Sequence, residues 1–311
     1  MSSHKSILTL IVIIAVVVSV VPQFGLAGQT TPSTAAHSAP TTAEADRTTT
    51  TNEPTTASST APTAAEIRAT AIEASRDVDT YRVRSIINRT ISTDRINRTA
   101  EVTARGVFNR TARELRTNQT TSTPMRTVNS TTYVVDESLY VRSNALVRQY
   151  SSEWVTTNLS GEIEARWRLL DTVTRQRVIL ANSSVRRVGT TTLNGTEAYV
   201  LEADVNETSY GRALQTQFST TTRNVTNASF TFWIARESGH ILQSQGTVTS
   251  TATLRGQPVT ISERLRLRFD DYDEPVTVTL PDAAATAVEI GNETTTTTQR
   301  DYRLWWNAPD R

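Results

Sequence analysis

The chain has 311 residues, with 32 Lys and Arg against 31 Asp and Glu, and it contains no cysteine. Without cysteine it can form no disulfide, no thiolate metal site and no lipid-modified N-terminal cysteine. The net charge is near zero, whereas nucleic-acid binding depends on a basic surface. No nucleic-acid partner is therefore expected. The three histidines, His4, His37 and His240, leave too few imidazoles in any folded domain for a two-histidine metal site.

Residues 1–27 contain an uncharged apolar segment, Ile7–Val21, that follows Lys5. A signal peptide has an apolar core of about 7–15 residues and small residues before its cleavage site, which Gly25 and Ala27 would supply. A membrane anchor needs about 20 apolar residues, and the segment extended to Ala27 approaches that length. Both interpretations place the rest of the chain outside the cytoplasm, because the positive flank stays inside. The protein is expected to be anchored to the cell membrane facing outward, or secreted after cleavage.

Two low-complexity segments frame the expected domain. Residues 28–62 consist mainly of Thr, Ser, Ala and Pro, without any aromatic residue, Leu, Ile or Val. Such a composition buries too little apolar surface to fold, so it predicts a disordered linker of the kind found in O-glycosylated stalks. Residues 284–311 are expected to form a Thr-rich C-terminal tail that ends near Trp305-Trp306. One folded domain is expected over residues 63–283.

Twelve of the 15 asparagines begin an N-x-S/T sequon, which is more than the Ser and Thr content would give by chance. Sequons are acceptors for N-glycosylation in exported proteins and lie on exposed positions. The pattern predicts a densely glycosylated surface; a Thr-rich composition with Asn-Thr turns is the alternative. The candidate residues are Asn88, Asn97, Asn109, Asn118, Asn129, Asn158, Asn182, Asn194, Asn206, Asn224, Asn227 and Asn292.

Within the domain, Thr63-Ala-Ala-Glu66 is a capping box that predicts a helix over 64–76. Further helices are expected between Ser160 and Leu180 and over 209–219. The alternation of apolar and polar residues predicts strands elsewhere. These strands cover about 81–87, 98–108, 111–117, 131–135, 138–142, 185–192, 196–205, 228–235, 240–254, 258–269 and 275–280. This order predicts an α+β fold, in which a few helices pack on one face of a large antiparallel sheet.

Five motifs, in this order, resemble the LolA/LppX-type lipoprotein-carrier superfamily, and most of all its exported haloarchaeal members. They are Asp79–Val83, Tyr133–Val141, Gly195–Val200, Phe232–Ile234 and Phe269–Val276. The resemblance covers about 64–283 and implies a curved half-barrel of antiparallel strands with helices on its concave face, which holds acyl chains in characterised members. Two features depart from the pattern: the chain has no lipobox cysteine, and its net charge is near zero.

Large apolar side chains would line such a concave face, and the candidates are Trp167, Leu170, Leu214, Phe218 and Trp233. Two functions are compatible with these residues. The first is an exported archaeal surface glycoprotein that binds lipid or another apolar ligand non-covalently. The second is a structural or interaction glycoprotein whose own side chains fill the core. No enzyme, metal or cofactor is expected, because the sequence shows no nucleophile–base constellation, phosphate loop or metal motif.

Overall fold

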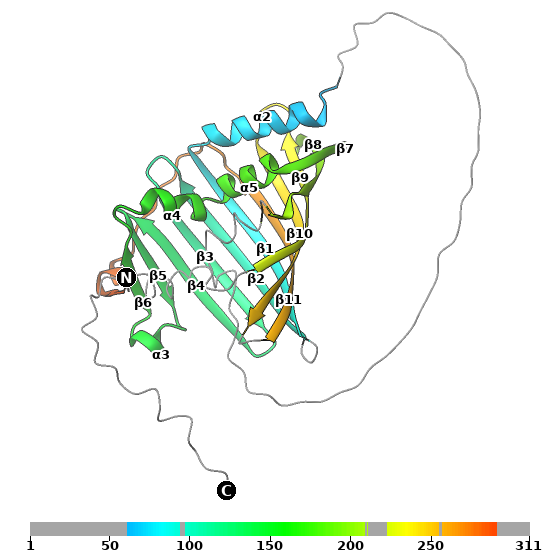
Figure 1. Ribbon diagram of the computed structural model, residues 1–311. Helices are drawn as coiled ribbons and strands as arrows, with labels where there is room; N and C mark the ends of the chain where they lie inside the picture. Colours follow the sequence, from blue (N-terminus) through cyan, green and yellow to red (C-terminus); the bar gives the residue numbers. More distant parts are fainter. Residues whose placement is uncertain (1–60, 94–96, 209, 211–222, 255–256, 291–311) are drawn as a thin grey trace, which may run out of the picture. The chain divides into compact units, whose positions relative to one another are not determined.

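The computed structural model describes residues 61–93, 97–208, 210, 223–254 and 257–290, which form a large sheet with helices on one face (Figure 1). The helices are α2 (Ala64–Asp77), α3 (Val147–Tyr150), α4 (Ile163–Leu170), α5 (Thr172–Ala181) and the short 3-10 helix η1 (Asp282–Thr286). The strands are β1 (Thr80–Ser92), β2 (Asn97–Asn109), β3 (Glu114–Thr123), β4 (Arg126–Val135), β5 (Ser138–Ser143), β6 (Trp154–Asn158), β7 (Ser183–Leu193), β8 (Thr196–Val205), β9 (Arg223–Ala235), β10 (Ile241–Leu254), β11 (Gln257–Asp270) and β12 (Val288–Glu289).

The strands form one open sheet in the order β12-β6-β5-β4-β3-β2-β1-β11-β10-β9-β8-β7. Every neighbouring pair is antiparallel except β12 and β6, which run parallel. Consecutive strands are neighbours from β1 to β6 and from β7 to β11, and two long-range pairings place β1 beside β11 and β12 beside β6. The expected α+β fold, with helices on one face of a large antiparallel sheet, is confirmed, and the parallel β12 is an addition to it.

Helix α2 begins where the sequence places its capping box. The backbone N–H of Thr63 donates to Glu66 Oε2 at 2.7 Å, and the backbone N–H of Glu66 donates to Thr63 Oγ1 at 3.2 Å. These bonds satisfy two of the amides that a helix N-terminus leaves without a partner. Ile67, Ala71 and Ser75 form the buried stripe of the helix, which packs mainly on α5.

Each strand divides its side chains between two faces, which we call the inner face and the outer face. The inner face is the one on which α4 and α5 lie, and in β1 it carries the buried residues Tyr81 and Val83. Exposed arginines such as Arg82 alternate with them on the outer face. The register carries the division across the sheet, since Tyr81 lies opposite Phe108 of β2 and Val83 lies opposite Phe269 of β11.

Two segments differ from the expected strands for physical reasons. β3 and β4 extend through 118–130, which the apolar pattern did not predict, because Gln119 and Thr121 occupy the inner positions there. Residues 275–280 alternate like a strand but join no ladder. Instead, Val278 packs against Tyr133 and Trp154 in a small cluster on the outer face.

The folded part continues beyond residue 283, where the tail was expected to begin. Ala284 is buried with Val278, and β12 pairs with β6. The backbone N–H of Ile290 donates to the carbonyl of Thr156 at 2.8 Å. We therefore propose that the domain extends from residue 63 to residue 290.

Candidate functional site

Near the helices, the inner face is a packed aromatic core. Tyr81 and Phe108 stack with their ring centroids 4.6 Å apart, and Trp167 of α4 meets Phe108 edge-on at 6.4 Å. All three side chains are buried. Such pairs stabilise beyond the area they bury, so this end of the inner face is filled by the protein itself.

A buried carboxylate fixes helices α4 and α5 to this core. Asp171 lies between the two helices, and its Oδ1 accepts from Tyr81 Oη at 2.7 Å. Its Oδ2 accepts from Arg110 Nε at 3.0 Å and from Thr174 Oγ1 at 2.5 Å. The hydroxyl of Tyr81 in turn accepts from the backbone N–H of Thr172 at 2.8 Å. Burial, and then the charge of Asp171, raise the pKa of Tyr81 well above its usual value, so the phenol stays a donor.

Farther along the strands, the inner face changes character. Figure 1 shows α2, α4 and α5 over one end of the sheet, and within the described ranges no helix lies over the far ends of β1, β2, β10 and β11. Most of the inner positions there are aliphatic or small, apart from Arg98 opposite Ile91 and the facing residues Arg89 and Glu263. The aliphatic and small residues include Ile87, Ile91, Ala100, Val102, Ala104, Gly246, Val248, Ala252, Val259, Ile261 and Leu265. Val102, Val248, Val259 and Ile261 are buried, and Ile87, Ile91 and Leu265 are partly buried. This part of the inner face is thus apolar and has no aromatic side chain among these positions.

One ion pair interrupts this apolar stretch. Arg89 of β1 and Glu263 of β11 are cross-strand neighbours on the inner face, and both are buried. Arg89 Nε donates to Glu263 Oε1 at 2.6 Å, and its Nη2 lies 2.5 Å from the same oxygen. Breaking a buried pair leaves an uncompensated charge, so the pair marks a fixed polar point within an apolar surface.

Three of the five expected ligand-lining residues lie in the described part of the chain, and these three do not share one surface. Trp167 is buried in the aromatic core, and Leu170 packs partly buried against the same core. Trp233 faces the opposite side of the sheet, since its neighbour Phe232 is the inner residue of β9. Leu214 and Phe218 lie outside the described residues, as do the apolar segment 7–21 and the linker.

The outer face carries the glycosylation candidates. Eleven of the twelve sequon asparagines lie in the described part of the chain; ten are exposed and Asn109 is half-buried. Asn292 lies outside it. Eight of the eleven lie in strands, and the register places all eight on the outer face. They are Asn88, Asn97, Asn109, Asn118, Asn129, Asn158, Asn224 and Asn227. A residue and the second one after it share a face of a regular strand. Each acceptor Ser or Thr within these strands therefore points the same way as its Asn, except Thr226, which lies at a bulge of β9.

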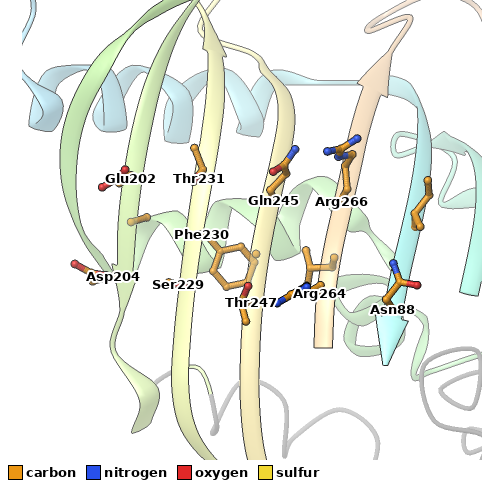
Figure 2. A pocket seen from close by; sticks show the side chains of 14 residues that line it. Asn88, Glu202, Asp204, Ser229, Phe230, Thr231, Gln245, Thr247, Arg264 and Arg266 are labelled. Carbon is orange, nitrogen blue, oxygen red and sulfur yellow. The ribbon is translucent and has the colours of Figure 1, made fainter. Parts of the chain in front are cut away.

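A hollow of about 680 Å³ lies on this outer face, across β1, β11, β10, β9 and β8 (Figure 2). Asn88 and the guanidinium-bearing Arg264 and Arg266 line one side of it. Glu202 and Asp204 of β8 line the other side, and Glu202 pairs with Arg186 of β7. The hollow is therefore polar, with donors and acceptors on opposite sides.

The described residues give no sign of metal chemistry or of a membrane-spanning helix. No group of His, Asp and Glu within them could hold a metal ion. Two carboxylates of the 270–274 segment already have partners near the start of β1: Asp271 pairs with Arg82 at 2.9 Å, and Asp273 accepts from the backbone N–H of Asp79 at 2.7 Å. Among the helices in the described part, none has the length and apolar character needed to cross a membrane.

Three features of the site were not predicted: the Arg89–Glu263 pair, the buried Asp171 and the outer hollow. A signal for the first is present in the sequence, because Arg89 occupies the inner register of Tyr81, Val83 and Ile87. Asp171 carries no such signal, since two of its partners, Tyr81 and Arg110, come from segments far from it in the chain. The hollow depends on which strands become neighbours, and no local pattern contains that information.

Comparisons with known proteins were made for both sequence and structure. No family model matches the sequence, and no curated protein matches it. Solved structures similar to this one include LprF from Mycobacterium bovis, with 12% identity, a TM-score of 0.42, and coverage of 70% of this chain and 96% of that one. They also include the lipoprotein LppX from Mycobacterium tuberculosis, with 14% identity, a TM-score of 0.37, and coverage of 68% and 98%. A LolA superfamily protein from Nitrosomonas europaea matches with 13% identity, a TM-score of 0.22, and coverage of 71% and 96%. These structure neighbours are of the LolA/LppX type that the sequence motifs resemble.

Proposed function

We propose that the protein is an exported surface glycoprotein whose domain holds an apolar ligand, such as a lipid acyl chain, on the inner face of its sheet. The observation that carries this proposal is the contrast between the two faces. The outer face bears every strand sequon, and the inner face beyond the helices bears small and aliphatic side chains. Binding of the ligand would be non-covalent.

The small side chains support the ligand hypothesis over a self-filled core. Along the inner side of β2 the residues are Gly106, Ala104, Val102 and Ala100, and the first three lie opposite Thr117, Gln119 and Thr121 of β3. The ring of Phe108 covers Gly106, whereas Ala104 and Ala100 are only partly buried, and we infer that an apolar ligand fills the space over these two alanines. An acyl chain entering that space would gain about 0.8 kcal/mol for each buried CH₂ group. Hence no polar recognition is required for affinity.

The test is titration of the purified domain, freed of lipid, with fatty acids of increasing chain length and a fluorescent fatty acid as the reporter. Saturable binding that tightens with each added pair of methylenes is expected. Ile87 and Ile86 provide a matched pair, since they are adjacent in β1 and point to opposite faces. Ile87→Arg should weaken binding at least tenfold, whereas Ile86→Arg should leave it unchanged.

A second variant guards against misfolding of the first. Ala104→Phe adds bulk on the inner face without adding charge, so it should reduce affinity for the longest chains most. Circular dichroism and thermal melting report whether each variant is folded. No saturable binding by a folded, delipidated domain would favour the structural alternative, in which the domain holds no ligand.

The glycoprotein part of the proposal is supported by the exposure of the sequons and is tested separately. Mass spectrometry of tryptic peptides from protein made in its native host should find sugars on several outer-face asparagines. The intact mass should then exceed the 34.3 kDa of the polypeptide, unless leader cleavage offsets the gain. Unmodified peptides at every sequon would contradict it.

A further inference from the structure

The outer hollow has charged and polar side chains that neither the proposed apolar ligand nor the core requires. It extends over five adjacent strands, which corresponds to about 19 Å at the usual strand spacing. Arg264 and Arg266 lie on β11, and Glu202 and Asp204 lie on β8, with two strands between them. Figure 2 shows these side chains and those of β9 and β10 around one depression. The hollow is thus built from side chains of both charges, separated by neutral polar residues.

The middle of the hollow supplies groups that both donate and accept hydrogen bonds. Thr231 of β9 and Gln245 and Thr247 of β10 lie there. Gln245 also contacts Arg266, whose Nε and Nη2 lie 2.9 and 3.0 Å from the amide oxygen when the amide is turned to face the guanidinium. Arginine only donates, carboxylates only accept, and hydroxyls do both. A ligand suited to the whole surface must therefore offer many groups that can act either way.

A chain of sugars has that chemistry. Its hydroxyls can accept from the guanidinium groups and donate to the carboxylates. An inorganic anion would be attracted by the arginines but repelled by Glu202 and Asp204, and a cation would meet the reverse. Ile86, which is 43% exposed at the edge of the hollow, adds an apolar patch for the C–H face of a sugar ring.

A sugar chain can be attached within the hollow itself. Asn88 lines the hollow, begins the sequon Asn88-Arg89-Thr90, and is exposed. Its direct cross-strand neighbour is Arg264. A ligand tethered this close has a millimolar effective concentration, so weak individual hydrogen bonds would suffice to hold it. We propose that the first sugars of a glycan on Asn88 lie in the outer hollow and bridge β1 to β8. This inference rests on the proposed glycosylation and adds where one glycan lies.

The experiment compares two glycans on the same folded molecule. Asn118 is the reference, because it is an exposed outer-face sequon beside an arginine, Arg105, but lies outside the hollow. Native glycoprotein is treated with mild periodate, which oxidises accessible vicinal diols, and each site is then followed by glycopeptide mass spectrometry. Sugars on Asn88 should react at least fivefold more slowly than those on Asn118, and unfolding in urea should abolish the difference.

Variants identify the hollow as the cause. The double variant Arg264→Ala/Arg266→Ala should raise the reaction rate at Asn88 to that at Asn118. The matched variant Arg105→Ala/Arg116→Ala removes two exposed outer-face arginines near Asn118 and should leave the rate at Asn88 low. Equal rates at the two sites in the folded wild-type protein would overturn the inference while leaving glycosylation intact. Sugars on other sequons with none on Asn88 would also overturn it. Their absence from every sequon would instead refute the proposed glycoprotein.

Discussion

At the residue scale, Asp171 is the side chain whose removal should lower the stability of the fold most. It is fully buried, and three side chains donate to its carboxylate: Tyr81 of β1, Arg110 of the turn after β2, and Thr174 of α5. Asp171→Ala would leave the mostly buried Arg110 without its counter-charge, so it should lower the free energy of unfolding by about 3–5 kcal/mol. Urea denaturation monitored by circular dichroism measures the loss.

The matched control for Asp171 is Asp271, which also pairs with an arginine. Its pair with Arg82 is half-exposed on both sides, and exposed pairs contribute about 0–1 kcal/mol. Asp271→Ala should therefore change stability by less than about 1 kcal/mol. If the two variants lost the same stability, burial of Asp171 would not be the cause.

His240 should make stability depend on pH. Its ring contacts that of Tyr272 in a tilted arrangement with centroids 4.3 Å apart. Burial lowers the pKa of the imidazole, although the nearby Asp273 acts in the opposite direction. The folded state thus binds the proton less readily than the unfolded state, whose pKa is about 6.5. Stability should fall as the pH drops through that value and level off below the lowered pKa.

Thermal melting between pH 8 and pH 5 tests this dependence. Asparagine is polar like histidine but does not titrate. His240→Asn should therefore make the plot of melting temperature against pH flatter in that interval. If the melting temperatures of the wild type and the variant depend on pH with the same slope, His240 does not cause the pH dependence.

At the element scale, an aromatic ring on one strand lies against a neighbouring strand because the facing residue has no side chain. A Cβ built on Gly246 of β10 would lie 2.4 Å from the ring of Phe230 on β9. Gly246→Ala should therefore destabilise the protein by about 1–3 kcal/mol, as overpacking does. Gly189 in β7 has no atom within 4 Å of its added Cβ, so Gly189→Ala should change stability by less than about 0.5 kcal/mol.

A double variant tests whether the contact itself is responsible. In the background of Phe230→Leu, the space over Gly246 opens and the second substitution should be tolerated. A coupling energy above about 0.5 kcal/mol is expected from equilibrium denaturation of the four proteins. Additive effects would mean that the loss arises elsewhere in the strand.

The elements differ in how well the sequence predicts them. Helix α2 follows from local chemistry alone, because its capping box and its stripe of Ile67 and Ala71 lie within one segment. Strands β1, β2 and β8 to β11 follow from apolar alternation with one dry face. The full lengths of β3 and β4 could not be predicted from apolar alternation, because the polar residues Gln119 and Thr121 occupy inner positions of β3. Trp233 shows the same limit at the site, because one residue of register decides which face a side chain reaches.

At the scale of the whole molecule, the division into two faces can be tested by moving one sequon. Exchanging two neighbours, as in Asn118→Gln/Gln119→Asn, keeps the composition and creates the sequon Asn-Thr-Thr one residue later. That shift turns the acceptor to the inner face, where Gln119 is buried and its Nε2 donates to Thr121 Oγ1 at 3.1 Å. A glycan there is incompatible with the fold.

We expect the exchanged variant either to lack sugar at residue 119 or to lose its thermal transition. Asn118→Gln alone is the control and should fold normally with one glycan fewer. Folded protein that melts at the wild-type temperature and is fully glycosylated at residue 119 would contradict the assignment of faces.

Strand β7 lies at one edge of the sheet, and this position affects how the protein self-associates at high concentration. An outermost strand has backbone amides and carbonyls available to another chain, which invites edge-to-edge aggregation. Three features oppose it here: a bulge between Arg187 and Gly189, exposed arginines in the strand, and a sequon asparagine directly before and after it, Asn182 and Asn194. Sugars at those two positions would bracket the open edge from both ends. Protein made without sugars would keep only the bulge and the charges, and the growth of strand-paired assemblies would then begin at β7.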